Sequence, residues 1–466
     1  MSKESIQLAL ASYESNYENL FKQFLTFLSI PSVSTADNIE DAMQKAAKFL
    51  VDKFEEIGFQ NVQAFPTTRH PIVYGEYFVG PEKPTLLLYG HYDVQPPDPL
   101  EDWETPPFSP QLRDDYIYAR GASDMKGQVW AFISALQAIH ETSDLPLNIK
   151  LLIEGEEEIG SPSLDRFLKE HKSLLKCDVA LNTDAGMLAP DKPTIVTGLR
   201  GIAYFELRLF GPNADLHSGV FGGTVGNPAN ILCQVVADMH DDHHRVTLPG
   251  FYDNVLELSV EEKRALSQIG MNENFFKDIS GVPALLGEEG YSPVERVGAR
   301  PTLDVNGFYS GYINKGAKTI IPAYAMAKIS TRLVPDQDPK EILESMKLFL
   351  EDHVPEAVKW ELDFLSGAPA YIAEKQTTGL DQFSKALEAT WGVQPLMKRE
   401  GGSVPVATSM KEILGIDSIL TGFGLPDDKI HSPNERLHMP THRKGVEALI
   451  RFFLSFLKEE RQQYDR

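Results

Sequence analysis

The chain has 466 residues, of which 42% are hydrophobic and 24% charged, and its formal net charge is −23. These values predict a soluble globular protein of two or three domains, and the acidic charge argues against nucleic-acid and anionic-membrane partners, which require basic surfaces. The two cysteines, Cys177 and Cys233, lie far apart, so we expect no disulfide framework, no cysteine metal site and a cytoplasmic location. Residues 1–20 lack a signal-peptide pattern, and no apolar run is long enough to span a membrane.

The first part of the chain alternates helices with strands. Apolar spacing predicts helices over residues 6–28, 40–57, 128–141 and 164–175, and strands over 62–65, 72–78, 86–90, 149–153 and 179–182. This alternation predicts an α/β fold, in which helices cover both faces of a mostly parallel mixed sheet.

A different order of elements begins near Gly198. Strands are expected over 203–210, 302–308, 323–334 and 358–365, and helices over 228–239 and 339–353. The order βαββαβ is that of a ferredoxin-like α+β unit with an antiparallel sheet. We therefore predict an inserted domain at residues 199–369, with an irregular insert around 248–299. A helix at 380–391, a strand at 418–422 and a helix at 442–457 resume the first pattern, so residues 1–198 and 370–466 form the first domain.

The strand at 86–90 is followed by His91 and Asp93, which share one side of an extended chain. The carboxyl end of a buried strand is where open α/β sheets place their ligand sites. A carboxylate two residues on would hold the imidazole in one tautomer and leave its other nitrogen for a metal. For this pair alone, a buried histidine with a turn-capping aspartate is an equal alternative.

More acids follow strands or glycine-rich turns of the first domain, and another histidine lies in its C-terminal part. They are Asp124, Glu157, Glu158, Asp184 and His431. The alternatives are a helix cap for Asp184 and a solvated charge run for residues 156–158. Adjacent acids directly after an apolar strand repel each other, and a pair of divalent cations would offset that repulsion. Two histidines with carboxylates suit zinc, with manganese as the alternative because oxygen donors dominate.

Four motifs, in this order, carry a resemblance to a known family. They are Gly90-His91-Tyr92-Asp93-Val94-Gln95-Pro96, Ser123-Asp124-Met125-Lys126-Gly127, Glu154-Gly155-Glu156-Glu157-Glu158-Ile159-Gly160-Ser161 and Asp215-Leu216-His217-Ser218-Gly219. They resemble the dinuclear metallopeptidases related to aminoacylase and glutamate carboxypeptidase, most closely the carnosinase and cytosolic nonspecific dipeptidase branch. The resemblance covers essentially the whole chain and implies a zinc-exopeptidase-like catalytic domain with an inserted lid and dimerisation domain.

The resemblance also implies a role for each candidate residue of the first domain. His91 and Asp184 would complete one metal ion, Glu158 and His431 the other, and Asp124 would bridge both. Three carboxylates and two neutral imidazoles leave two dications with a surplus of about +1, which a bridging hydroxide neutralises. Asp93 would orient His91, and Glu157 would be the general base. The family also implies a cis peptide bond between Asp124 and Met125.

In the inserted domain, the resemblance implies groups that bind substrate. His217 would reach the active site of the partner subunit in a homodimer and stabilise the oxyanion there, with Thr319 as its companion. Arg332 would clamp the substrate's C-terminal carboxylate, because a guanidinium suits a bidentate hold. Gly402 and Ser403 would assist it. From the residues alone, a surface salt bridge for Arg332 and a plain turn for the glycines are the preferred alternatives.

Three features depart from the family pattern or imitate a site. Gly226-Asn227 stands where the dipeptidases have a histidine and an acid, which bears on specificity. Glu156 replaces an apolar residue and is expected to perturb the neighbouring base. The run from His240 to His244 imitates a second metal site, but its place after a helix favours a solvated helix end.

We therefore expect metal-dependent hydrolysis of dipeptides or similar small peptides with a free C-terminal carboxylate. The same fold also supports an alternative activity, removal of the acyl group from an N-acyl amino acid, as in aminoacylases and desuccinylases. The alternative of another class is a non-catalytic peptide-binding protein.

Overall fold

The computed structural model describes residues 3–36, 40–374, 377–402 and 405–456. The chain divides into two compact units, the first made of Met1–Thr197, Ala373–Met397 and Ser409–Arg466 and the second of Gly198–Ile372 and Lys398–Thr408. Residues 398–408 belong to the second unit, whereas the sequence assigned all of 370–466 to the first domain. Two hydrogen bonds explain this difference, from Arg200 Nε to Gly401 O at 3.0 Å and from Arg399 Nη2 to Glu262 Oε1 at 2.8 Å.

The first unit is built on a mixed β-sheet. Its strands run in the order β1 (Gln60–Phe65), β2 (Ile72–Tyr77), β6 (Asn148–Glu154), β3 (Thr85–His91), β7 (Val179–Asn182), β17 (Ser418–Leu420) and β8 (Thr194–Leu199). The four central strands, β6, β3, β7 and β17, are parallel to one another, and antiparallel strands flank them on both sides. The predicted mostly parallel sheet is confirmed, and the antiparallel strand β8 was not foreseen.

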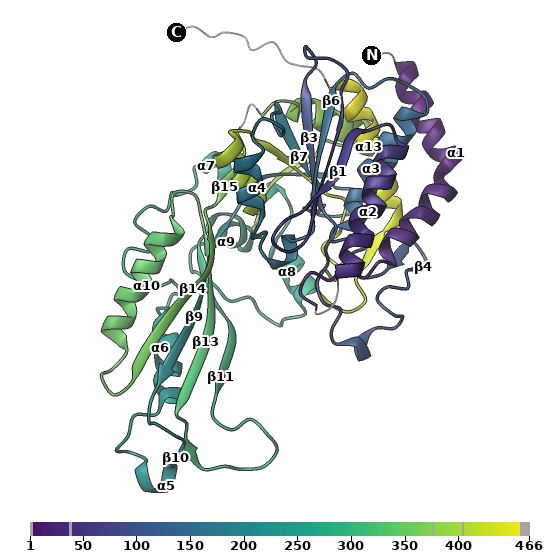
Figure 1. Ribbon diagram of the computed structural model, residues 1–466. Coiled ribbons are helices and arrows are strands. Elements are labelled where there is room, and N and C mark those ends of the chain that lie inside the picture. The colour runs from purple at the N-terminus through teal and green to yellow at the C-terminus, as the bar shows by residue number, and fades with distance from the viewer. Residues whose placement is uncertain (1–2, 37–39, 375–376, 403–404, 457–466) are drawn as a thin grey trace. The chain divides into compact units, whose positions relative to one another are not determined.

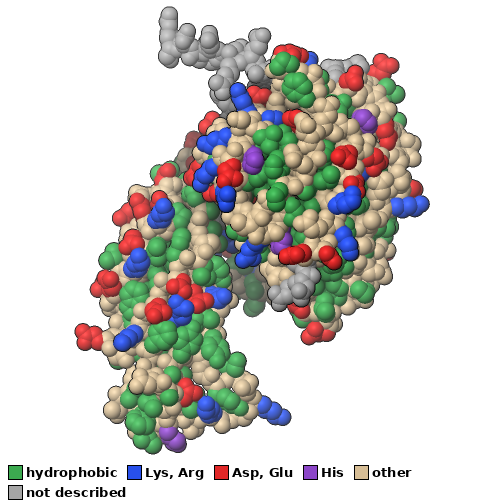
Figure 2. All heavy atoms as spheres, in the orientation of Figure 1, with side chains coloured by type: hydrophobic (Ala, Val, Ile, Leu, Met, Phe, Trp, Pro, Cys, Tyr) green, Lys and Arg blue, Asp and Glu red, His purple; other side chains and the backbone are tan. Residues whose placement is uncertain are grey.

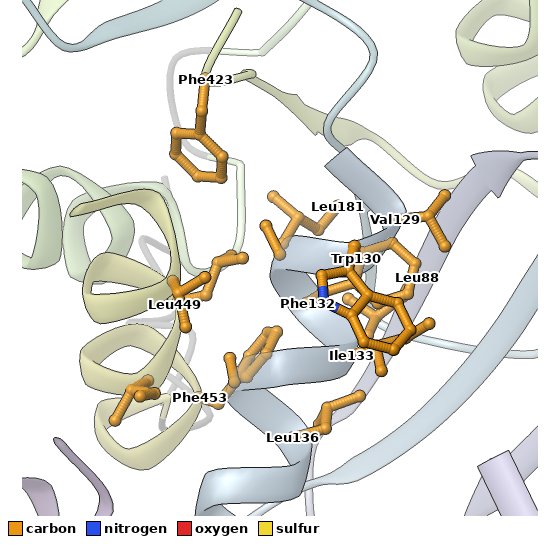
Figure 3. Packing of buried hydrophobic residues seen from close by; sticks show 14 of the residues in the cluster. Leu88, Val129, Trp130, Phe132, Ile133, Leu136, Leu181, Phe423, Leu449 and Phe453 are labelled. Atoms are coloured by element: carbon orange, nitrogen blue, oxygen red, sulfur yellow. The ribbon is translucent and has the colours of Figure 1, made fainter. Parts of the chain in front are cut away.

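Helices pack around this sheet. They are α1 (Lys3–Leu28), α2 (Glu40–Glu56), α3 (Lys126–His140), α4 (Leu164–Glu170), α11 (Leu380–Trp391) and α13 (Met439–Ser455). Helix α3 is buried along nearly its whole length, between α1, α13 and the sheet. Figure 3 shows Trp130 and Phe132 of α3 among Leu88 and Leu181 of the sheet and Leu449 of α13. Each such side chain stabilises the fold by about 1.5–3 kcal/mol. Because α3 begins just after residue 124, this packing anchors the loop before it.

The parallel strands end at one edge of the sheet. His91 is the last residue of β3, and β6 ends at Glu154, shortly before the 3₁₀ turn η2 (Glu157–Ile159). Strand β7 ends two residues before Asp184. Since parallel strands deliver their carboxyl ends to a common edge, these polar residues meet there.

A small three-stranded sheet joins the C-terminal part of the first unit to residues 111–118. Its order is β18 (Arg436–His438), β5 (Tyr116–Tyr118) and β4 (Gln111–Arg113), all antiparallel. The pairing of β18 with β5 places the loop before β18 beside the loop after β5. The sequence pattern did not predict these short strands.

The second unit contains a four-stranded antiparallel sheet. Its elements in chain order are β9 (Gly201–Phe210), α6 (Pro228–Asp238), β11 (Thr302–Ser310), β13 (Tyr324–Leu333), α10 (Pro339–His353) and β14 (Lys359–Ala368), and the spatial order is β11-β13-β9-β14. This is the predicted ferredoxin-like arrangement (Figure 1). Residues of β9 alternate between buried and half-buried positions, so one face of the sheet lies against the helices. Figure 2 shows acidic and basic side chains interspersed with hydrophobic ones on the visible face of this unit.

The predicted irregular insert is partly helical, which corrects that expectation. It contains α7 (Val260–Gln268), α8 (Glu273–Ser280) and α9 (Pro293–Ala299). Capping boxes begin α7 at Ser259 and α9 at Ser292, and such caps stabilise short helices whose apolar spacing is weak. The other short elements are η1 (Leu100–Asp102), β10 (Leu216–His217), α5 (Ser218–Phe221), β12 (Ile320–Ile321), β15 (Tyr371–Ile372), β16 (Leu396–Glu400), α12 (Pro405–Ser409) and the π-helical turn η3 (Met410–Leu414). Within the described ranges, no helix is both long and apolar enough to cross a bilayer.

Candidate metal centre

Asp124 lies between two histidines in the first unit. Its Oδ1 is 3.2 Å from His91 Nε2, and its Oδ2 is 2.9 Å from His431 Nε2. Asp184 Oδ1 lies 3.9 Å from the same nitrogen of His91, and Glu158 Oε2 lies 3.5 Å from that of His431. Two groups with metal-ligand spacing result, and both contain Asp124. The peptide bond between residues 124 and 125 is cis, as expected.

His91 is fully buried and held by Asp93. Its Nδ1 donates to the backbone oxygen of Asp93 at 3.0 Å, while the nearer carboxylate oxygen of Asp93 is 3.4 Å away. The ring therefore keeps its proton on Nδ1 and turns Nε2 toward the acids. The expected orienting contact is thus made mainly by a carbonyl rather than by the carboxylate.

The Asp93 carboxylate instead positions the acidic turn η2. Its Oδ1 accepts from Glu157 N at 3.2 Å, and its Oδ2 accepts from Glu158 N at 3.0 Å. Glu157 points toward the same centre without joining either group of three, and its Oε2 is 4.0 Å from His91 Nε2. One aspartate thus connects the histidine of β3 to both glutamates.

The electrostatics of this cluster show an excess of negative charge. Burial raises the pKa of Glu157 well above its usual value, that of Glu158 to about 8 and that of Asp184 to about 6, and repulsion between the acids adds to each shift. Burial would also raise the pKa of Asp124, but hydrogen bonds with His431 and His91 hold it below its usual value.

The donor set fits divalent cations. Glu158 Oε1 is buried and has no hydrogen-bond partner among the described residues. Buried polar atoms normally have a partner, so this oxygen is available to bind a cation. Imidazole nitrogens with carboxylate oxygens are ligands of zinc and of manganese. Cations between these acids would also offset the charge excess described above.

Glu156 faces away from this cluster. Its carboxylate accepts hydrogen bonds from Thr67 Oγ1 at 2.6 Å, His70 N at 2.9 Å and Ser163 N at 3.0 Å. The sequence led us to expect that Glu156 perturbs the neighbouring Glu157, but the groups that shift the pKa of Glu157 most are His91 and the acids of the cluster. The contacts of Glu156 instead anchor the start of the acidic turn.

Other residues at this centre were not assigned a role from the sequence. Gln95 Nε2 donates to Glu158 Oε2 at 2.7 Å, and Asn182 Oδ1 accepts from Asp184 N at 2.7 Å. Glu435 is fully buried beside the loop that carries Asp124. Gln95 and Glu435 lie four residues after His91 and His431, respectively. Closeness in sequence to a candidate ligand is therefore the feature by which they could have been predicted.

The substrate-binding candidates of the second unit form two groups. His217 pairs with Ile320 across β10 and β12, and the next residue, Ser218, donates its N–H to Thr319 O at 3.1 Å. His217 is exposed, and its Nδ1 accepts from Gly219 N at 3.0 Å. A neutral ring then carries its proton on Nε2, as a hydrogen-bond donor.

The second group lies near Arg332, which is on β13 and half-buried. Burial lowers the pKa of Arg332, and burial together with the nearby Arg332 lowers the pKa of Arg200 to about 10. Arg200 also donates to Gly401 O, so the Gly401–Gly402 turn is tied to the same region. Ser403 lies outside the described residues.

The two remaining sequence features have local structural roles. Asn227 caps α6 by accepting from Ala229 N at 2.9 Å. In the His240–His244 turn, Asp241 Oδ1 accepts from His243 N and Arg245 N, and His243 Nδ1 pairs with Glu289 at 2.8 Å. These contacts agree with a solvated helix end.

Comparisons with known proteins extend these observations. A model of peptidase family M20/M25/M40 matches residues 87–455. The Cys-Gly metallodipeptidase of Candida albicans is 30% identical over 442 residues, which cover 91% of each chain. The human Beta-Ala-His dipeptidase is 31% identical over 390 residues, 82% of this chain and 77% of that protein. The solved structure of an M20 family metallo-carboxypeptidase from Sulfolobus solfataricus superposes with a TM-score of 0.85 at 32% identity, covering 94% of this chain and 99% of its own.

These proteins are peptidases of the kind that the four motifs indicated, and the structural likeness confirms the predicted fold class. They favour neither the aminoacylase alternative nor a non-catalytic peptide-binding protein. Since a family model matches most of its length and relatives align along nearly all of it, the chain is a metallopeptidase that belongs to peptidase family M20/M25/M40.

Proposed function

We propose that this protein hydrolyses dipeptides and similar small peptides with a free C-terminal carboxylate at a dinuclear metal centre in the cytoplasm. The observation that carries the proposal is the position of Asp124, whose two oxygens each face a different histidine. The names of the relatives support the substrate class, because they include a Cys-Gly metallodipeptidase, a Beta-Ala-His dipeptidase and a metallo-carboxypeptidase.

In this proposal, five side chains hold two divalent cations, with zinc expected and manganese as the alternative. His91 and Asp184 would hold one ion, Glu158 and His431 would hold the other, and Asp124 would contribute to both. Bound cations would polarise the scissile carbonyl and lower the pKa of an attacking water. Glu157 takes the proton from that water and delivers it to the leaving amine. Asp93 holds the backbone of Glu157 in reach of the site.

The second unit supplies substrate-binding groups and the dimer interface. Arg332 clamps the terminal carboxylate, assisted by Gly402 and Ser403, and the neighbouring guanidinium of Arg200 adds positive charge. His217 donates to the developing oxyanion, with Thr319 beside it.

The geometry of the second unit favours a homodimer. His217 lies on β10, which pairs with β12 just before β13 begins at Tyr324, whereas Arg332 lies eight residues along β13 from Tyr324. Eight residues of strand span roughly 26 Å, but an extended dipeptide spans only about 7 Å. Because this separation is much longer than a small substrate, we propose that His217 acts on the substrate bound by the partner subunit.

A substrate panel tests the proposed reaction. We expect the metal-loaded enzyme to cleave dipeptides, to cleave their C-terminal amides much more slowly because Arg332 has no carboxylate to bind, and to leave N-acetyl and N-succinyl amino acids intact. Release of free amino acids is the measurement. Faster hydrolysis of the N-acyl amino acids than of any dipeptide would contradict the proposal and support the amidohydrolase alternative.

Co-expression of two inactive variants tests whether His217 acts in the partner subunit. His217→Ala and Glu157→Gln homodimers should both be nearly inactive. In a heterodimer of the two, the site with the native Glu157 also receives the native His217, so activity should return in one of its two sites. The measurement is kcat of the tagged and purified heterodimer. Heterodimers as inactive as both parents, or a fully active wild-type monomer, would rule out the trans role.

A further inference from the structure

The Glu435 carboxylate accepts four hydrogen bonds from the loop of residues 120–124. Its side chain is fully buried. Oε1 accepts from Ser123 N at 2.9 Å and Asp124 N at 3.1 Å. Oε2 accepts from Gly121 N at 3.0 Å and Arg120 Nη1 at 2.7 Å. Both carboxylate oxygens are thus occupied by N–H donors from one loop, and the carboxylate itself is not a candidate metal ligand.

Further hydrogen bonds hold Glu435 and the preceding residue, Asn434, against the segment of residues 102–119. The Glu435 carbonyl accepts from Ala119 N at 3.1 Å. Asn434 Oδ1 accepts from Glu104 N at 2.9 Å, and Asn434 Nδ2 donates to Asp102 O at 2.8 Å. Asn434 and His431 have positive φ angles of 61° and 63°. Such conformations are uncommon outside glycine and persist only where the surroundings hold them.

Arg120 extends this set of contacts to the segment that follows the strand of His91. Its side chain is 1% exposed, and its Nη2 donates to Pro96 O at 3.1 Å, in the segment that follows His91 and Asp93. The Glu435–Arg120 pair therefore joins the segment around Pro96, the loop of residues 120–124 and the C-terminal segment of Glu435. These three parts of the chain carry His91, Asp124 and His431, respectively.

We propose that Glu435 is a positioning residue of the metal centre, which holds the backbone of Asp124 against the loop of His431 so that the two Asp124 oxygens face the two histidines. This inference rests on the proposed metal centre. A buried ion pair that only stabilised the fold would not change metal affinity. A residue that orients a metal ligand does, because its removal weakens metal binding.

The second unit provides a matched control. Arg300 and Glu288 are 3% and 6% exposed and form a bidentate pair, with Arg300 Nε and Nη2 at 2.8 and 2.7 Å from the two carboxylate oxygens. Glu288→Gln should therefore disturb a buried ion pair of similar geometry that belongs to the second unit and not to the unit that carries the metal centre.

The experiment compares Glu435→Gln with Glu288→Gln. The glutamine amide presents a donor where the backbone N–H groups need an acceptor, so Glu435→Gln disrupts the loop contacts. On metal-stripped protein, the Kd of each of two Zn²⁺ ions is measured by competition with a chromogenic chelator, and Tm is measured before and after loading. We expect Glu435→Gln to raise the Kd of at least one ion by about 10–100-fold and to reduce the metal-induced rise in Tm. Glu288→Gln should lower Tm but keep both Kd values.

If Glu435→Gln does not fold, Glu435→Asp serves in its place, because it keeps the charge beside Arg120 but is too short to reach the amides of residues 123 and 124. Wild-type Kd values in the folded variant, or an equal loss of affinity in Glu288→Gln, would overturn the positioning role and leave the metal centre untouched. A wild-type protein that binds fewer than two ions would overturn the proposed metal centre and this inference with it.

Discussion

The Glu157→Gln variant is expected to lose about 10²–10⁴-fold in kcat while it still binds two metal ions. Glu157 points into the cluster beside His91 but belongs to neither group of candidate ligands. Burial and the neighbouring acids raise its pKa, which makes its carboxylate a better proton acceptor, and nearby cations would offset part of that rise. The glutamine amide keeps the size of the side chain but cannot accept the proton. Steady-state kinetics and metal content of the same preparation are the measurements.

The adjacent residue provides the control for this prediction. Glu158→Gln should lose metal as well as activity, since its carboxylate faces His431 at 3.5 Å and its other oxygen has no protein hydrogen-bond partner among the described residues. If Glu157→Gln retained wild-type kcat, or if it lost metal to the same extent as Glu158→Gln, Glu157 would not be the general base.

The Asp124→Asn variant is expected to weaken the binding of both ions by more than about 100-fold, the upper range for residues that only support a ligand. An asparagine can offer an oxygen to one side alone and turns an amide donor toward the other histidine. Both metal positions share Asp124, so a single substitution should affect both. The measurement is the number of ions that remain per chain after dialysis, together with hydrolysis of a dipeptide.

Asp241→Asn is the matched control, since Asp241 also accepts hydrogen bonds from neighbouring groups but lies in the histidine-rich turn of the second unit. It should keep two ions per chain and full activity. Loss of an ion in Asp241→Asn, with both ions retained in Asp124→Asn, would place the metal site in the second unit and contradict the proposed centre at Asp124.

Much of this architecture could be predicted because local patterns coincide with it. The leucine-rich run before Gly90 forms a central parallel strand, and His91 ends that strand as expected. The βαββαβ order of the second unit also produced the expected sheet. Burial of both faces leaves a continuous apolar run in the sequence, as in the strand that ends at His91, and burial of one face leaves alternation, as in the sheet of the second unit.

The features that could not be predicted depend on contacts between distant segments. The short strands β5 and β18 have little periodicity, yet their pairing brings His431 to Asp124. The caps at Ser259 and Ser292 organise helices within a stretch that the apolar pattern left irregular. Glu435 is a further case, because a buried acid that binds backbone amides cannot be distinguished in sequence from one that is solvated.

The same limit applies to the details of the candidate site. The sequence related Asp93 to His91, and the structure adds that the Asp93 carboxylate also holds the amides of Glu157 and Glu158. Glu156 was expected to disturb the base, whereas its partners lie on the other side of the turn, at Thr67 and Ser163. Residue type and spacing indicated the chemistry, but the direction of each side chain followed from tertiary packing.

Anomalous diffraction from a crystal of the zinc-loaded enzyme would show whether Asp124 holds two ions. We expect two zinc peaks per chain, about 3.5–4 Å apart, each about 2.0–2.2 Å from a different oxygen of Asp124. One peak should also contact His91 and Asp184, and the other Glu158 and His431. A single peak, or two peaks of which neither contacts Asp124, would contradict the proposed metal centre.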